Sequence, residues 1–157
     1  MTVITVTAPA GRISRMQRQV LATTLTDAVL EPEVGQMAPA ARVGFQVHFT
    51  DLDADRMAIG GKLISETEAD IMVVDVRVMD GDWPASVRSV VIANILQALA
   101  SALEVDAPSP AWWVLFSVIE EGSWGSRGGV LSILDLLQSG VFTEDKQQAI
   151  RARIEQQ

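Results

Sequence analysis

The residues with the clearest chemical potential in this sequence are an amino-terminal threonine, one loop arginine and the single histidine. If Met1 is removed, the α-amino group of Thr2 titrates near neutral pH and can act as a base or form an imine. Arg12 offers a planar cation that can clamp a carboxylate, with ordinary surface solvation as its alternative role. His48 can act as an acid or a base, although a lone strand histidine is more often structural.

Two more arginines and a set of tryptophans are candidates for binding rather than for proton transfer. Arg77 is predicted on a strand, where it either contacts a ligand or pairs with an acid at a subunit interface. Arg127 precedes a glycine pair and either reaches a neighbouring pocket or provides ordinary hairpin polarity. Four tryptophans without any tyrosine suggest a large apolar wall: Trp83, Trp112, Trp113 and Trp124. Core and subunit packing is the alternative explanation for at least two of them.

The composition narrows the classes of partner. The 157 residues are 48% hydrophobic, which is enough for one full core. The net charge of −8 and the pI near 4.5 argue against nucleic acid and anionic membranes, because both need a basic surface. With no cysteine and a single histidine, neither a disulfide framework nor a metal site is expected, and no cofactor is implied. No signal peptide or membrane span is recognised, so a cytoplasmic protein is expected.

Two stretches about seventy residues apart have the same predicted order of elements, which indicates an internal repeat. Each has a strand of period 2, a helix of period 3.6, a second strand and a paired glycine. The first unit is predicted as a strand at 3–7, a helix at 14–29, a strand at 43–50 and Gly60-Gly61. The second is predicted as a strand at 71–78, a helix at 84–103, a strand at 112–119 and Gly128-Gly129. One domain of two repeats, 1–66 and 67–140, with a helical tail at 141–157, is therefore predicted.

The two predicted helices differ in how much of their surface is apolar. In the first helix, five residues are predicted on the buried side: Met16, Val20, Leu21, Thr24 and Ala28. The end of that helix is predicted from Glu31-Pro32 and Gly35. In the second helix an apolar residue recurs every fourth position from Val87 to Leu103, and Asp82 is the predicted N-cap. The second helix is expected to be buried on more than one side.

Each repeat predicts a right-handed β-α-β crossover with parallel strands. Two such units side by side give an α+β fold, a four-stranded core sheet with both helices on one face. By alternation, the valines of the third strand point toward the helices, whereas Asp75, Arg77 and Met79 lie on the open face. An open sheet face is normally covered by another subunit, so an oligomer is expected.

Two segments of the chain resemble a known family. The run Gln46-Val47-His48-Phe49-Thr50-Asp51, a loop, and Ala58-Ile59-Gly60-Gly61-Lys62-Leu63 is similar to the second strand and hairpin of 4-oxalocrotonate tautomerase. Ala10-Gly11-Arg12 resembles the loop after that family's first strand. The duplicated form is similar to cis-3-chloroacrylic acid dehalogenase, within the tautomerase superfamily. The resemblance implies a homotrimer of tautomerase-like β-α-β-β-α-β subunits, with a hydrophobic pocket at the N-terminal end of the first strand.

The resemblance places a different residue at the family's central catalytic position. That family uses an amino-terminal proline, exposed when the initiator Met is removed, as a general base or acid, and the matching residue here is Thr2. Retention of Met1 would place the terminal amine one residue, about 3.3 Å, too far out. Met79 and Asp82 match two arginines that hold the substrate carboxylate in the dehalogenase. Ordinary tautomerase or dehalogenase activity is therefore expected to be weak or absent.

Other positions of the family's pocket are also replaced. The resemblance places Val29 at a helix histidine, Leu115 at a strand tyrosine and Ser126 near a water-activating glutamate. Gln46 replaces the tautomerase's substrate-polarising arginine, whereas Arg12 matches its loop arginine and is expected to serve a neighbouring subunit's site. The expected pocket is thus apolar, with at least one tryptophan in its wall. Such a pocket suits a neutral or aromatic oxo compound better than a small dicarboxylate.

Two classes of function stay open from the sequence. One is an enzyme, either an isomerase that uses the Thr2 amine after removal of Met1 or a cofactor-free dehalogenase or hydratase-like lyase. The other is a catalytically silent trimeric scaffold. The preferred expectation is that the protein binds a small, largely apolar or aromatic oxo compound. The predicted substrate-binding residues are Arg12, Val29, Gln46, His48, Arg77, Leu115, Trp124, Ser126 and Arg127.

Overall fold

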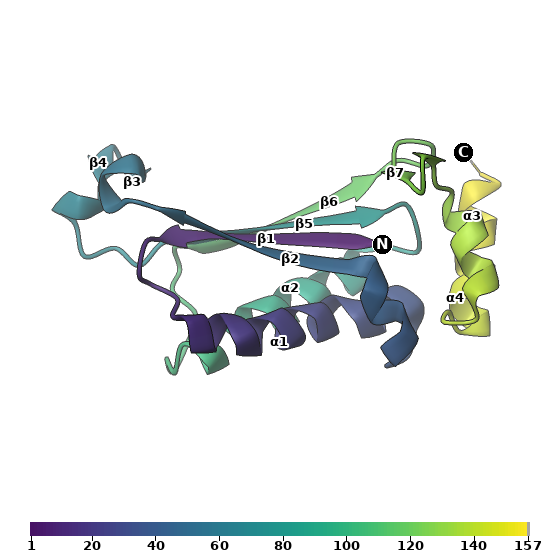
Figure 1. Ribbon diagram of the computed structural model, residues 1–157, viewed down its shortest axis with the longest axis horizontal. Helices are drawn as coiled ribbons and strands as arrows, with labels where there is room; N and C mark the ends of the chain where they lie inside the picture. Colours follow the sequence, from purple (N-terminus) through teal and green to yellow (C-terminus); the bar gives the residue numbers. More distant parts are fainter. Residues whose placement is uncertain (157) are drawn as a thin grey trace.

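The computed structural model describes residues 1–156 and shows a four-stranded sheet with two long helices on one face (Figure 1). The first unit is β1 (Thr2–Pro9), α1 (Arg15–Val34) and β2 (Phe45–Leu52), and the second is β5 (Met72–Met79), α2 (Ala85–Ala102) and β6 (Trp112–Ile119). The strand order is β2-β1-β5-β6. The strands of each unit pair in parallel, whereas the central β1–β5 pair is antiparallel. The predicted α+β fold is confirmed.

A small hairpin follows each β-α-β unit. The hairpins are β3 (Ala58–Ile59) with β4 (Lys62–Leu63), and β7 (Gly125–Ser126) with β8 (Gly129–Val130). Gly60 and Gly61 have φ of 60° and 81°, and Arg127 and Gly128 have φ of 53° and 83°. Two-residue hairpin turns with positive φ at both positions match the right-handed twist of the strands. Arg127 thus occupies the backbone position that Gly60 has in the first repeat, and the glycine of the predicted second pair is shifted by one residue.

The main core lies between the sheet and the two long helices. The inward residues of β1 and β5 are fully or almost fully buried: Ile4, Val6, Ala8, Met72, Val74, Val76 and Val78. From α1, Leu21, Leu25 and Val29 complete this core. Met16 and Val20 are 77% and 52% exposed, so their predicted burial is wrong. Successive helix residues are rotated by about 100°, and the stripe through Leu21 and Leu25 therefore turns Val20 toward solvent.

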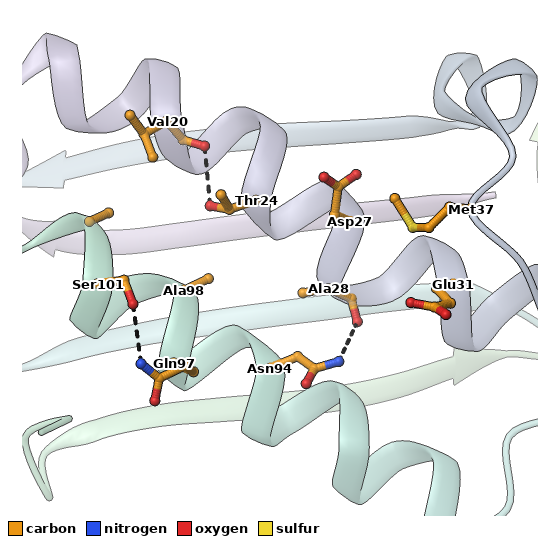
Figure 2. A pocket seen from close by; sticks show the side chains of 11 residues that line it. Val20, Thr24, Asp27, Ala28, Glu31, Met37, Asn94, Gln97, Ala98 and Ser101 are labelled. Atoms are coloured by element: carbon orange, nitrogen blue, oxygen red, sulfur yellow. Dashed lines mark hydrogen bonds between the residues drawn. The ribbon is translucent and has the colours of Figure 1, made fainter.

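Helix α1 continues past Pro32, which the sequence predicted as part of its end. Proline cannot donate a backbone hydrogen bond, so its presence leaves the carbonyl of Ala28 without the usual i to i−4 partner. Asn94 of α2 donates a long hydrogen bond of 3.5 Å from Nδ2 to this carbonyl (Figure 2). The helix ends at Gly35, which the sequence also predicted as an end signal and whose φ of 84° forms a left-handed cap. The extension brings Glu33 into the last turn of α1.

Helix α2 packs on the sheet through one stripe. Val91, Ile95 and Leu99 are fully buried in the main core, whereas Val90 is half exposed, so the prediction of burial on more than one side is wrong. By length and composition α2 is apolar enough to cross a membrane, but its buried stripe is that of a core helix. Pro84 is the N-cap and makes no side-chain cap bond. The predicted N-cap, Asp82, is wrong because its carboxylate binds Lys146 instead.

The C-terminal segment covers the end of the sheet at which β1 begins (Figure 1). It contains α3 (Ile133–Leu136) and α4 (Glu144–Ile154), joined by a short 3₁₀ turn. A second apolar cluster forms beneath it from the ends of α1 and β5 and from the segment itself: Leu30, Val34, Met79, Leu131, Ile133, Leu137, Phe142 and Ile150. Met79 is buried in this cluster, so its predicted place on an open face is wrong.

Candidate active site

A partly open cavity of about 150 Å³ lies at the N-terminal end of β1. Its wall combines the first residue, the end of α1, the 3₁₀ turn before β2, the second hairpin and the C-terminal segment. The residues are Met1, Glu33, Val34, Ala40, Ala41, Val43, Gly44, Phe45, Arg127, Leu136, Ser139, Val141 and Phe142. Most of these side chains are apolar, and Glu33 and Arg127 are the charged ones. A mainly apolar cavity with a few converging polar groups is the usual form of a small-molecule site.

Met1 and Glu33 of the cavity wall form a polar cluster with Thr2, which lies behind them. The α-amino nitrogen of Met1 lies 2.8 Å from Oε1 of Glu33. The Thr2 hydroxyl donates to Oε2 of the same carboxylate at 2.9 Å. The Met1 carbonyl accepts a hydrogen bond of 3.0 Å from the Met79 amide, which holds the first residue in line with β1. Met1 therefore lines the cavity and carries the amine that pairs with Glu33, while Thr2 is buried and does not line the cavity.

The loop after β5 carries acids that the C-terminal segment neutralises. Asp82 accepts a hydrogen bond of 2.7 Å from Nζ of Lys146, and the buried carboxylate of Asp80 lies 2.8 Å from Nη2 of Arg153. Arg153 also donates to the carbonyl of Gly81. Where the resemblance expects cations that hold a substrate carboxylate, this loop therefore binds α4. The acids here stabilise the cavity wall instead of providing an anion site.

Arg127 is the cation that faces the cavity. Its positive φ is rare for a residue with a side chain, and at this position the first repeat uses glycine. Within residues 1–156 its guanidinium forms no ion pair and no hydrogen bond. Residues in strained backbone conformations cluster at active sites and ligand sites, so Arg127 is a candidate binding residue. The sequence left two roles open for Arg127, contact with a neighbouring pocket or ordinary hairpin polarity. In the structure it lines the cavity of its own chain.

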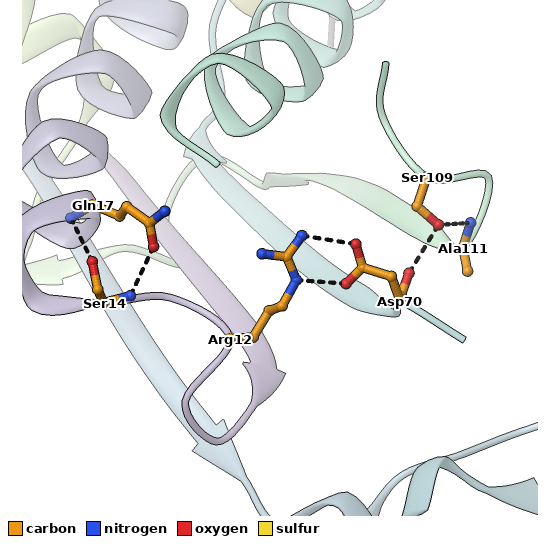
Figure 3. A network of polar contacts seen from close by, with 6 residues as sticks. All are labelled: Arg12, Ser14, Gln17, Asp70, Ser109 and Ala111. Carbon is orange, nitrogen blue, oxygen red and sulfur yellow. Dashed lines mark hydrogen bonds and ion pairs between the residues drawn. The ribbon is translucent and has the colours of Figure 1, made fainter. Parts of the chain in front are cut away.

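Arg12 lies at the opposite end of β1 and forms a closed network within the chain (Figure 3). Its Nε and Nη2 donate to both carboxylate oxygens of Asp70, each at 2.8 Å. The guanidinium also lies 5.8 Å from the ring centroid of Trp112. The hydrogen bond from Arg12 lowers the pKa of Asp70, and the same bond raises the pKa of Arg12. Arg12 and Thr2 do not share a site within one subunit.

Solved structures of other proteins share the fold of this chain. No protein-family model and no curated protein matches the chain. A solved member of the cis-3-chloroacrylic acid dehalogenase (cis-CaaD) family matches with a TM-score of 0.69 and 21% identity, covering 96% of this chain and 99% of its own. A native fused 4-OT matches at 0.67 with 24% identity and coverages of 82% and 94%. Another fused 4-OT, described as a symmetric trimer, matches at 0.67 with 20% identity and coverages of 88% and 98%. The chain has the tautomerase-superfamily fold.

The open face of the tautomerase-like sheet carries four of the predicted binding residues. Gln46, His48, Arg77 and Leu115 all point away from the two helices, as the register of the strands requires. His48 Nε2 and Gln46 Oε1 lie 3.0 Å apart. Thr5 lies between His48 on β2 and Asp75 on β5, and Leu115 follows on β6. These residues form one surface that is separate from the cavity.

The remaining predicted residues divide between core and cavity. Val29 is fully buried in the main core, and Ser126 lies in β7 next to the turn. Trp124 is partly buried against the second apolar cluster, together with Met1 and Phe45. The structure thus brings Trp124 and Arg127 to the N-terminal end of β1 and leaves Val29 in the core. Among residues 1–156, no group of three or more metal-ligating side chains is present.

A larger hollow of about 590 Å³ lies between α1 and α2 on the outer side of the tautomerase-like fold (Figure 2). It is open to solvent, and most of its polar groups already have partners. Thr24 donates to the carbonyl of Val20, and Asp27 pairs with Arg42. Glu31 also lines the hollow and forms no ion pair within residues 1–156, but no cation lines it beside that carboxylate. The smaller N-terminal cavity, which has both an acid and a cation in its wall, is therefore the better site despite its size.

Several cavity residues were missed by sequence reasoning. Glu33 was placed beyond the end of α1 because Pro32 was interpreted as part of the helix end. Gly35, the other predicted end signal, favoured the longer helix, since a left-handed glycine cap commonly follows the last turn. Val141 and Phe142 were assigned only to the fold. Their place in the same cavity wall as Met1 depends on how the C-terminal segment folds back, and no local pattern encodes that.

Proposed function

We propose that this protein is a homotrimer whose N-terminal cavity binds a small, largely apolar or aromatic oxo compound. Ordinary tautomerase or dehalogenase activity is weak or absent. The observation that carries the proposal is the cavity itself, which is mainly apolar and at which the amine of Met1 is already paired with Glu33. An apolar wall favours an apolar ligand body, while Arg127 can hold a single carboxylate or oxo group.

Weak ordinary activity follows from the groups that stand at the family's catalytic positions. Thr2 replaces proline and is buried, and Met79 lies in the second apolar cluster. Asp82 repels a carboxylate and is bound to Lys146. Each lost transition-state contact costs on the order of several kcal/mol. Phenylenolpyruvate and 3-chloroacrylate should therefore turn over far more slowly than is ordinary for the family.

The proposed trimer is supported by two observations. Solved neighbours include fused 4-OT proteins described as symmetric or asymmetric trimers. The open sheet face exposes two large apolar side chains, Trp113 and Leu115, at 55% and 50%. In the trimer this face packs against other copies, and Gln46, His48 and Arg77 lie at the subunit boundary. We place the protein in the cytoplasm, with no nucleic acid or membrane partner.

Two alternative functions are each supported by a specific observation. The Thr2 hydroxyl already contacts Glu33, so removal of Met1 would leave a Thr2 amine beside the same carboxylate and permit amine-dependent isomerase chemistry. A trimeric scaffold without catalysis is the other alternative, supported by the exposed sheet face. Intact mass measurement decides the first alternative, because a retained Met1 excludes the Thr2 amine as the catalyst.

Fluorescence titration tests the binding proposal. Phenylpyruvate, an aromatic oxo acid, and fumarate, a small dicarboxylate, are added separately, and Trp124 is the reporter next to the cavity. Phenylpyruvate is expected to bind more tightly and to change the fluorescence. A Trp124→Phe variant identifies the signal of this residue. Preference for fumarate that is lost in Arg12→Ala would contradict the proposal and restore an ordinary dicarboxylate site.

A further inference from the structure

Glu33 is an unexpected residue for its position. It lies in the last turn of α1, where the helix dipole disfavours a negative charge. Its side chain is only 5% exposed and lines a mainly apolar cavity. Burial of a carboxylate is costly unless donors compensate for the lost water. Glu33 has two such donors, the Met1 amine and the Thr2 hydroxyl, so its burial is compensated, whereas its place at the end of the helix breaks a local rule. Native proteins break such rules mainly at functional sites.

The contacts of Glu33 with the amino terminus persist whichever residue comes first. With Met1 present, the amine lies 2.8 Å from Oε1. Oε2 already accepts a hydrogen bond from the hydroxyl of Thr2. The backbone nitrogen of Thr2 is only three covalent bonds from its own hydroxyl oxygen, so a Thr2 amine would also lie beside the carboxylate. Glu33 is therefore the constant member of an amine–carboxylate pair. Met1 and Glu33 both line the cavity, so a ligand there can touch both groups.

We infer that Glu33 is a catalytic residue that transfers protons together with the terminal amine during keto–enol conversion of the bound oxo compound. The inference rests on the proposed binding function. The ammonium gives a proton to the enol carbon, and the π electrons of the C=C bond form the new C–H bond. The Glu33 carboxylate takes the enol hydroxyl proton, and the O–H electrons complete the C=O bond. The short hydrogen bond between amine and carboxylic acid then returns the proton to the amine and restores the ion pair.

Ketonisation of phenylenolpyruvate, followed by loss of the enol absorbance, tests this step. The unmodified protein should accelerate the reaction above the rate in buffer. Glu33→Gln should lower the accelerated rate about 100-fold. Phenylpyruvate affinity, measured by tryptophan fluorescence, should change by less than about threefold, because the lost group acts on the transition state. Glu31→Gln is the matched control, since it removes the same charge from an exposed position one half-turn away on α1.

Acetylation of the terminal amine provides a second route that leaves Glu33 unchanged, and it should cause a similar loss of rate. This arm keeps the test valid if Glu33→Gln fails to fold. Equal rates for the unmodified protein and Glu33→Gln would overturn the inference, and so would an acetylated protein with full activity. Binding of phenylpyruvate without any acceleration would also overturn it and leave the binding function standing. Absence of both binding and acceleration would overturn the binding function and the inference together.

Discussion

The carboxylate of Asp82 lies 2.7 Å from Nζ of Lys146, across 64 residues of chain. This contact joins the loop after β5 to α4, and Asp80 with Arg153 forms a second ion pair beside it. The same segment presents Val141 and Phe142 to the cavity. Asp82, which the resemblance places at a substrate-holding arginine, therefore attaches the C-terminal segment of the cavity wall to the loop after β5. Loss of this attachment should affect both stability and ligand binding.

Lys146→Gln is expected to lower the free energy of unfolding by about 1 kcal/mol, because the Asp82 carboxylate loses a partly buried charged partner. Urea denaturation measures this change. Arg18→Gln is the control, since it breaks the more exposed pair with Asp51 and should cost less than about 0.5 kcal/mol. Phenylpyruvate should also bind more weakly to Lys146→Gln than to the control. Equal losses in the two variants would show that the contact with α4 has no special role.

Arg127→Gly is expected to raise the stability of the protein and to weaken its binding of phenylpyruvate. Glycine adopts positive φ without steric cost, so the variant should gain up to about 1 kcal/mol in free energy of unfolding. Affinity for phenylpyruvate should fall severalfold, because the cation at the cavity is lost. Gly60→Ala in the first hairpin should instead lose stability by about 1 kcal/mol and leave binding unchanged. Unchanged affinity in Arg127→Gly would remove Arg127 from the site.

The architecture was predictable because its signals are local. Strand and helix periods repeat in the same order in both halves, and the paired glycines predict tight hairpins. The polar contacts were not predictable to the same extent. Arg12 and Asp70 are 58 residues apart, and no local pattern indicates their pairing. The position of Glu33 depends on a helix that continues through Pro32, where Asn94 of another helix donates to the carbonyl of Ala28 that the proline leaves without a partner. Contacts between residues distant in the sequence therefore determine the position of the site residues, and the local sequence pattern does not predict these contacts.

Acid titration should reveal the Arg12–Asp70 pair. The pKa of Asp70 is lowered in the folded state, first by the hydrogen bond from Arg12, relative to the ordinary value of 3.8. The resulting stabilisation is fully present above the ordinary pKa and is lost as pH falls below it, toward the lowered folded pKa. Asp70→Asn should remove this part of the pH dependence, on the order of 0.5 kcal/mol for a partly exposed pair. Parallel stability curves for the unmodified protein and the variant between pH 5 and 2 would contradict this assignment.

Light scattering tests the trimer. The unmodified protein should have a mass three times that of the 16.9 kDa chain. Leu115→Glu should dissociate it, because a charge on the open sheet face would be buried between subunits. Val20→Glu is matched in exposure, at 52% against 50%, but lies on the outer face of α1 and should leave the mass unchanged. A monomer at micromolar concentration, or dissociation caused by Val20→Glu instead, would refute the proposed interface.

The most direct measurement is mapping of amide chemical shifts by NMR during titration with phenylpyruvate. The proposed cavity predicts that the largest shifts occur at its lining residues, chiefly Glu33, Val34, Phe45, Arg127 and Val141. The larger hollow between the two helices serves as an internal comparison, with Thr24 and Gln97 as its reporters. Shifts concentrated around the N-terminal end of β1 would confirm the binding site. Shifts concentrated at Thr24 and Gln97, or no shifts at millimolar phenylpyruvate, would contradict it.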